Sequence, residues 1–185
     1  MRYHGEKEIE LACKNLELPT YIKRIVLDYL DKSRKKRCFF YYDDNFLGLG
    51  CLYLACKLHQ EPLTHIEVEK ETAHDFTGIT DVYKKLVREF DIFIKPIPPE
   101  KYAKKYMKKL NLSFDIQKQV LYLINKVREQ RTNFVCKPSK FAAGVVYFCC
   151  LTSGEPISQR KMGDVANTNE HFKPIVDYLI NNVVN

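Results

Sequence analysis

The chain has 185 residues, of which 45% are hydrophobic, and this is enough for one large domain or two small ones with a buried core. The composition excludes a disordered chain, and no run of about 20 apolar residues is present that could form a membrane-spanning helix. The first residues, Met1–Glu6, lack the apolar stretch of a signal peptide, so the sequence predicts a protein of a reducing compartment.

The net charge of +7 is unevenly distributed along the chain. Residues 1–97 contain 16 Lys+Arg and 16 Asp+Glu, whereas residues 98–185 contain 14 and 7. An excess confined to the second half indicates a polyanionic partner such as nucleic acid. On charge alone, a merely soluble basic surface is an equally good interpretation.

Hydrophobic residues at helical spacing predict five helices in the first half of the chain. Pro19 opens the second helix, in which Ile22 and Val26 recur at helical spacing. The third helix is apolar almost all round, which is typical of a central, buried helix. Thr64 followed by Glu67 forms a capping box at the start of the fourth. The predicted helices span roughly Glu6–Asn15, Thr20–Arg34, Asp44–Leu58, a segment from Thr64 onward, and Ile79–Phe90.

A proline-rich stretch, Phe93–Pro99, follows and is interpreted as a linker, because proline is excluded from helix interiors. The second half repeats the pattern of five helices, and no segment alternates for long with the period of two that is typical of strands. The sequence therefore predicts an all-α fold. The helices of the second half span roughly Glu100–Leu110, Phe114–Arg131, Ser139–Leu151, Gln159–Ala166 and Lys173–Val183.

The two halves are copies of one unit, related by a constant shift of 94 residues. Nearly fifty positions keep this register without a gap, which chance does not produce. We therefore predict two domains, residues 1–95 and residues 96–185. The shift carries Leu16 to Leu110, Gly50 to Gly144, Tyr53 to Tyr147 and Cys56 to Cys150.

No set of residues suited to catalysis or metal binding occurs in the sequence. Five of the seven cysteines lie in apolar helical patterns and none forms a C-x-x-C pair, so they are interpreted as core thiols. The five histidines are scattered, and no glycine-rich phosphate loop is present. Asp43 and Asp44 are interpreted as a helix cap. The sequence predicts a protein that is not an enzyme and has no catalytic residue, metal ligand or cofactor in this chain.

Residues 158–180 form a candidate helix-turn-helix. Ser158 can cap a helix through its hydroxyl, and Gln159 in the first turn can reach a phosphate oxygen. Gly163 is small where two helices would cross closely, and Asn167 tolerates the left-handed backbone of a tight turn. The next helix would then be the recognition helix. On these residues alone, ordinary docking of two helices explains the pattern slightly better.

The order of several motifs resembles the transcription factor IIB family. Cys51–Lys57 is similar to the central helix of that family's first repeat, and Ala142–Tyr147 resembles the alanine-rich central helix of the second. Pro99–Tyr102 is similar to the entry into the second repeat, and Ser158–Ala166 to the start of its fourth helix. Each motif alone is modest, but together they cover nearly the whole chain in the family's order.

The resemblance implies two five-helix cyclin-box repeats in tandem. It also implies a monomeric initiation-factor core, with no membrane association, that binds promoter DNA with the TATA-binding protein and bridges to RNA polymerase. The composition suits an AT-rich genome, such as that of a protist or a large DNA virus, so the expected location is the nucleus or a cytoplasmic viral replication site. The family's N-terminal zinc ribbon has no counterpart in this sequence, and zinc is expected only where the full-length protein carries one.

In the first repeat, the basic run Lys32–Arg37 lies near the place where the family contacts the minor groove. A solvated helix end explains this run equally well. Lys57 matches a family arginine that meets the TATA-binding protein. Two family lysines of the same surface align instead with Phe76 and Thr77, which indicates a diverged partner contact.

In the second repeat, Cys136 stands at a family arginine position, so a neighbouring lysine would have to replace it. At the start of the last helix, an ungapped alignment places His171 and Pro174 at the base-reading positions, and a one-residue deletion places Lys173 there instead. The resemblance thus implies a weakened base-reading contact. Across both repeats, the expected DNA-binding residues are Lys35, Lys36, Arg37, Lys137, Lys140, Ser158, Gln159, Arg160, Lys161, His171 and Lys173, and Lys57 is the expected protein contact.

A cyclin, which binds and activates a kinase, shares the expected fold and is the main alternative. A neutral first half and a basic second half favour DNA over a kinase as the partner. A relative serving another RNA polymerase, and a scaffold protein without a DNA role, also remain open.

Overall fold

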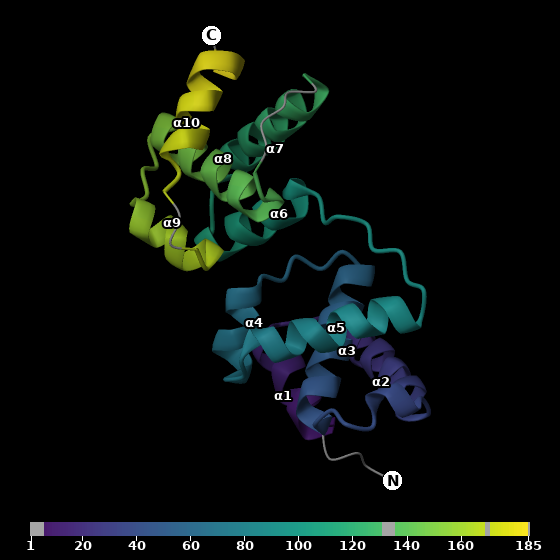
Figure 1. The fold of residues 1–185 in the computed structure, drawn as a ribbon. Helices are drawn as coiled ribbons and strands as arrows, with labels where there is room; N and C mark the ends of the chain where they lie inside the picture. Colours follow the sequence, from purple (N-terminus) through teal and green to yellow (C-terminus); the bar gives the residue numbers. More distant parts are fainter. Residues whose placement is uncertain (1–5, 131–135, 169–170, 185) are drawn as a thin grey trace. The chain divides into compact units, whose positions relative to one another are not determined.

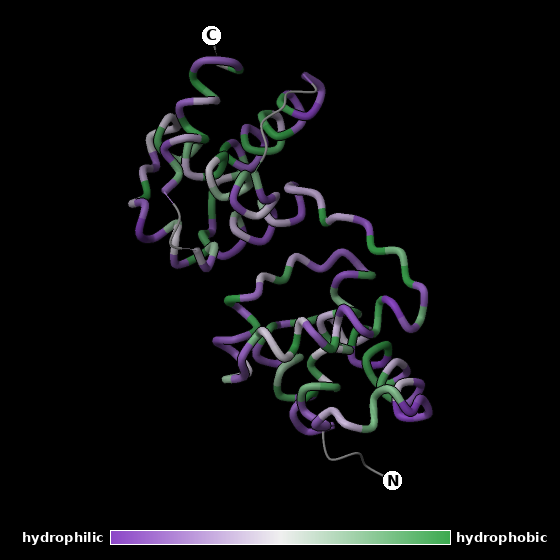
Figure 2. The backbone as a smooth tube through the Cα atoms, in the orientation of Figure 1, coloured by the Kyte–Doolittle hydropathy of each residue, from purple (hydrophilic) through white to green (hydrophobic). Residues whose placement is uncertain are grey.

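The computed structural model of the protein describes residues 6–130, 136–168 and 171–184 (Figure 1). Within these residues all regular structure is helical and no strand occurs, which confirms the predicted all-α class. The chain divides into two compact units, Met1–Pro96 and Ile97–Asn185, and each has its own hydrophobic core. Figure 2 shows that hydrophilic and hydrophobic residues alternate along the helices, a pattern that is typical of helices with one apolar face.

The first unit is built around α3, which packs against α1, α2 and α5, while α4 packs against α1 and α5. Nine residues of α3 are buried, as expected for a helix that is apolar almost all round. Asp43 begins it by accepting a hydrogen bond from the Asn45 backbone N–H at 2.8 Å, which confirms the predicted cap. The elements are α1 (Glu6–Asn15), α2 (Thr20–Arg34), the 3-10 helix η1 (Arg37–Phe39), α3 (Asp44–Leu58), α4 (His65–Thr72) and α5 (Phe76–Glu89).

Local capping explains where the helices of the first unit begin. Thr64 accepts from the Glu67 backbone N–H, and the Glu67 carboxylate accepts from the Thr64 backbone N–H at 3.0 Å, so the predicted capping box is present. Helix α5 starts three residues before the predicted Ile79, because the Asp75 carboxylate caps it by accepting from the Thr77 backbone N–H at 3.2 Å.

The second unit is built around α8, which packs against α6, α7, α9 and α10. Pro99 and Pro138 lie in the first turns of α6 and α8, where no backbone N–H is needed. The last predicted helix is divided, since its final turn is π-helical, and the predicted end of the second helix at Arg131 lies outside the described residues. The elements are α6 (Pro99–Leu110), α7 (Phe114–Glu129), α8 (Pro138–Thr152), α9 (Gln159–Ala166), α10 (Lys173–Leu179) and η2 (Ile180–Val184).

The sequence repeat reappears as a repeated packing contact. A Cβ atom added at Gly50 of α3 would lie 2.3 Å from Val82 Cγ1 in α5, and one added at Gly144 of α8 would lie 2.6 Å from Ile175 Cδ1 in α10. Both distances are far below van der Waals contact. In each unit, therefore, the fifth helix approaches the central helix closely at a glycine, Gly50 in α3 and Gly144 in α8.

Five cysteines are buried in the two cores, and Cys38 and Cys136 are half-buried; all seven are free thiols. The interpretation as core thiols is therefore confirmed for the five. Burial raises the pKa of Cys51 and Cys149 to about 12 and that of Cys13 and Cys150 to about 11. Among the described residues, no group of His, Cys, Asp and Glu is arranged to hold a metal ion. None of the helices described here has the length and apolarity to cross a membrane.

Candidate nucleic-acid interface

Helices α9 and α10 lie where the sequence predicts a helix-turn-helix, and each of them packs on α8. The Ser158 hydroxyl accepts a hydrogen bond from the Lys161 backbone N–H at 3.1 Å and so caps α9. Asn167 ends α9 in the left-handed conformation, with φ 48°, as expected for a tight turn. The reason expected for Gly163 was wrong, because a Cβ there would lie 2.8 Å from the Thr168 carbonyl oxygen. Glycine is needed at this position because the turn that follows α9 passes close to it, and not because a second helix crosses α9 there.

The start of α10 is fixed by a buried aromatic residue between two exposed polar ones. Phe172 is fully buried, and its ring lies 5.7 Å from that of Tyr147 in α8. His171 and Lys173 on either side of it are exposed. With Pro174 in the first turn, α10 begins at Lys173, as the sequence predicts. Asn169 and Glu170, which precede this segment, lie outside the described residues.

The predicted DNA-binding residues of the second repeat are distributed along α8 rather than gathered at one point. Lys137 and Lys140 lie at the N-terminal end of this helix. The start of α10 packs near the middle, through Ile175 on Gly144. The first turn of α9 lies near the last turn of α8, since Lys161 acts electrostatically on the Cys150 thiol. The helix between these ends is about 22 Å long. A ligand that met all these residues would therefore have to be extended.

Most of the basic side chains predicted to bind DNA in the second repeat are exposed to solvent. Arg160 and Lys161 in the first turn of α9, Lys137, His171 and Lys173 are all exposed, and Gln159 beside them is exposed too. None of these five basic side chains forms an ion pair with a carboxylate in the part of the chain that the structure describes. Lys140 is half-buried. The second repeat thus presents positive charge that the fold itself does not neutralise.

Helix α6 is a further source of positive charge that sequence analysis missed. It carries five lysines and one glutamate within 12 residues. Lys101, Lys104 and Lys108 are exposed and follow one face of the helix at spacings of three and four residues. The helical spacing of these lysines could have predicted a basic face on this helix. With five lysines and one glutamate, α6 holds a good part of the charge excess of the second half.

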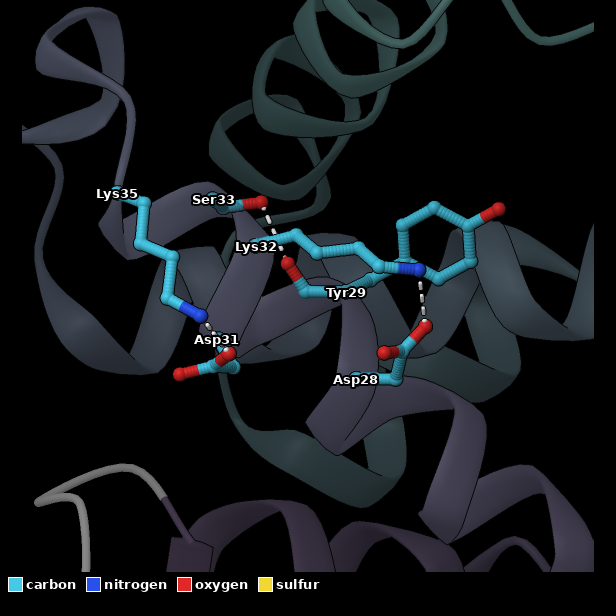
Figure 3. Close-up of polar contacts among 6 residues, drawn as sticks. All are labelled: Asp28, Tyr29, Asp31, Lys32, Ser33 and Lys35. Atoms are coloured by element: carbon cyan, nitrogen blue, oxygen red, sulfur yellow. Dashed lines mark hydrogen bonds and ion pairs between the residues drawn. The ribbon is translucent and has the colours of Figure 1, made fainter.

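The basic run of the first repeat is mostly engaged within its own unit. The ammonium groups of Lys32 and Lys35 each lie 2.6 Å from a carboxylate four residues earlier, Asp28 and Asp31 respectively (Figure 3). Arg34 forms an ion pair with Asp44 at the start of α3. Three of the five cations in this run are therefore neutralised by their own unit.

Lys36 is engaged differently, because its ammonium donates to the Glu89 carbonyl oxygen at 2.6 Å and lies 4.5 Å from the centre of the Phe90 ring. It thus places a positive charge at the C-terminal end of α5, where the helix dipole favours one. Arg37, at the start of η1, is exposed and has no side-chain partner in the described part of the chain. Of the three residues predicted to bind DNA in this run, Arg37 alone is uncommitted.

The position of Lys36 predicts a loss of stability on its removal. Lys36→Ala should lower the free energy of unfolding of the first unit by about 1 kcal/mol, because it removes a charged hydrogen bond and a cation–π interaction together. Urea unfolding followed by circular dichroism would measure the change. Lys35→Ala, at an exposed ion pair, should leave stability unchanged within error. Equal effects of the two substitutions would contradict this role for Lys36.

Lys57, the predicted protein contact, lies at the edge of an aromatic cluster. Its ammonium is 4.7 Å from the centre of the Tyr53 ring, and burial lowers its pKa. The Tyr53 ring in turn meets the edges of Phe76 and Tyr83, each at 5.1 Å between ring centres. Phe76, which stands where the family has a lysine, is therefore a packing residue here, and the role of Lys57 in partner binding stays a prediction.

The fold and this site define an all-helical core of two five-helix repeats, whose second repeat is basic and contains the candidate helix-turn-helix. Curated relatives are similar in sequence to most of this chain. Transcription initiation factor IIB 3 of Halobacterium salinarum is 26% identical over 163 residues, 88% of this chain. Transcription initiation factor IIB 1 of Thermoplasma volcanium is 25% identical over 164 residues, 89% of this chain. The resemblance found in the sequence is confirmed: over most of its length the chain is similar to the core of transcription initiation factor IIB.

The chain spans about half the length of these relatives, 51% and 53% respectively. A third, transcription initiation factor IIB 2 of Haloferax volcanii, is 29% identical over 124 residues, 67% of this chain and 37% of its own length. No protein-family profile matches the chain. Among solved structures, a viral cyclin from herpesvirus saimiri matches with 13% identity and a TM-score of 0.40, over 95% of this chain and 81% of that chain.

Proposed function

We propose that the chain is the core of a general transcription initiation factor, which binds promoter DNA together with a TATA-binding protein and bridges this complex to RNA polymerase. The role is one of binding and not of catalysis, and it would be exercised wherever the genome is transcribed. The observation that carries the proposal is the helix-turn-helix of the second repeat, whose basic side chains are exposed and uncommitted.

Each part of the helix-turn-helix has a distinct role in this proposal. Ser158, Gln159 and the cations Arg160 and Lys161 bind phosphates at the start of α9, which fixes the register of the protein on the duplex. Lys173 at the start of α10 reaches a base edge in the major groove. A lysine fixes geometry less well than an arginine fork, so the sequence preference is expected to be weak.

The test is a gel shift on TATA-containing duplex DNA, with and without the cognate TATA-binding protein, at several salt concentrations. This chain should bind the complex of DNA and TATA-binding protein far more tightly than it binds bare DNA. Changing Lys137, Lys140, Arg160 and Lys161 to Ala should lower the salt slope by about one for each phosphate that is no longer neutralised.

The matched control removes four exposed lysines of the first unit, Lys7, Lys14, Lys84 and Lys95, and so changes the net charge equally. This variant should retain most of the salt slope, because its effect is limited to long-range attraction. Equal affinity for bare DNA and for the complex would overturn the proposal. Equal slopes for the two four-residue variants would show that the second repeat is not the DNA-binding surface.

A further inference from the structure

Two adjacent aromatic residues, Phe40 and Tyr41, are exposed in the turn between η1 and α3. Tyr41 has 96% of its surface in contact with solvent and Phe40 has 63%. The sequence gives no signal for them, because Phe39–Tyr42 is a run of four aromatic residues in which no spacing separates buried rings from exposed ones. In the structure the outer two of this run are anchored and the middle two face water.

The turn that carries these two rings is held in place on both sides. Phe39 is buried and stacks on Phe90, with 6.3 Å between ring centres and 10° between ring planes. The Tyr42 backbone N–H donates to the Phe39 carbonyl at 3.2 Å, and the Phe40 N–H donates to the Arg37 carbonyl at 3.2 Å. The backbone of the turn is therefore held in place without a ligand, so less of it has to be ordered on binding.

Positive charge flanks the pair. In a 3-10 helix, residues three apart lie on the same side, so Arg37 shares a side of the chain with Phe40. Lys85 of α5 lies 5.1 Å from the centre of the Tyr42 ring at the base of the turn. The nearby carboxylates are engaged, since Asp43 caps α3 and Asp44 pairs with Arg34. The surroundings of the two rings thus suit an anionic ligand with flat apolar faces.

We propose that Phe40 and Tyr41 stack on unpaired nucleobases of DNA, with Arg37 on the adjoining phosphate. The proposal deepens the proposed function, on which it rests for DNA as the ligand. The other four cations of the neighbouring basic run are occupied: Lys32 and Lys35 pair with Asp28 and Asp31 (Figure 3), Arg34 pairs with Asp44, and Lys36 binds the end of α5. Charge alone therefore supplies little affinity here. Stacking must supply it, and stacking needs an exposed base face.

This requirement decides between duplex and unpaired DNA. In a closed duplex the base faces are covered by their neighbours, and a side chain that wedges between them has to unstack a base step at a cost. Unpaired bases offer their faces without that cost, and they tolerate any sequence, because every base has a flat aromatic face. The turn is therefore suited to DNA strands that have separated.

The test compares two DNAs of the same top-strand sequence, one a full duplex and one with an internal unpaired bubble that contains 2-aminopurine. The wild-type chain should bind the bubble about tenfold more tightly than the duplex and should quench the 2-aminopurine fluorescence through stacking. Combined Phe40→Ala and Tyr41→Ala should remove both the preference and the quenching. Binding to the complex of duplex and TATA-binding protein should remain as in wild type.

Two controls separate stacking from general effects. Phe93→Ala removes an aromatic ring that is 80% exposed outside this turn and should change neither readout. Combined Phe40→Tyr and Tyr41→Phe keeps two rings and should retain the quenching, while Arg37→Ala should lower the salt slope on the bubble by about one. Both aromatic side chains are exposed, so thermal unfolding should be unchanged in every variant.

The outcomes distinguish this inference from the proposed function. If the wild type does not prefer the bubble, or if the double alanine variant binds and quenches like wild type, the stacking role is wrong and the pair faces a protein or only solvent. If the bubble preference holds and depends on the two rings while no complex forms with the TATA-binding protein, stacking stands and the proposed function is wrong.

Discussion

Raising the pH from 8 to 10 should lower the free energy of unfolding on the order of 5 kcal/mol, because four buried thiols cannot ionise in the folded chain. Burial raises the pKa of Cys13 and Cys150 to about 11, and of Cys51 and Cys149 to about 12, from an ordinary value of 9.0. Above pH 9 the unfolded chain loses these protons and the folded chain keeps them. The stability is therefore fully present below pH 9 and is lost progressively as the pH rises toward 11 to 12.

Urea midpoints at pH 8, 9 and 10, measured under argon with a reductant, would show this loss. Each thiol contributes about 1.4 kcal/mol at pH 10, so Cys51→Ala should make the pH dependence shallower by that amount. Val26→Ala, which shortens a buried side chain that has no titratable group, is the control and should leave the slope as in wild type. The lowered pKa of Lys57 acts in the opposite direction, whereas the raised pKa of Tyr21 and that of Tyr83 add to the loss. Stability that does not change between pH 8 and 10 would contradict the prediction.

Gly144→Ala should destabilise the second unit by about 1–3 kcal/mol and weaken the proposed binding to DNA. Helix propensity alone predicts that the substitution raises stability, since alanine is more favourable than glycine within a helix by about 1 kcal/mol. Packing decides the outcome, because the new Cβ would meet three atoms of Ile175 at 2.6 to 2.7 Å. The contact would displace α10 from α8 and move His171 and Lys173 with it.

Urea unfolding and the gel shift would measure the two effects of Gly144→Ala. Adding Ile175→Ala should recover part of the stability, so that the two substitutions are not additive. Gly154→Ala provides a control without packing, because Gly154 has φ 79° and open space around it. That change should cost about 1–2 kcal/mol through backbone strain alone and should leave DNA binding intact. A Gly144→Ala variant more stable than wild type would show that α8 and α10 do not pack as described.

Much of the fold was predictable because the start of a helix is often marked by a capping residue that can be recognised in the sequence. Asp43, Thr64 and Ser158 are each followed by residues whose backbone N–H groups they cap, and the helices begin where these side chains stand. The start of α5 was missed since Thr77 and Gly78 are weak helix formers, and the cap at Asp75 outweighs them.

The candidate site was less predictable, because availability depends on contacts between distant residues. The pairing of Lys32 and Lys35 with carboxylates four residues earlier could have been seen from spacing. The contact of Lys36 with Glu89 could not, since 53 residues separate them. Exposure of Tyr41 was also hidden, because a run of four aromatics carries no periodicity that separates the buried rings from the exposed ones.

Each repeat has a closed core of its own, and residues 92–98 join the two as a tether without helical structure. Binding of one repeat to DNA would therefore hold the other repeat close to the DNA. Because the tether is short, the effective concentration of the second repeat would be high. Two contacts that are individually weak can then give a long-lived complex. Under the proposed function, each repeat would dissociate and rebind while the other stays on the DNA, so the protein would remain bound while the strands open and close.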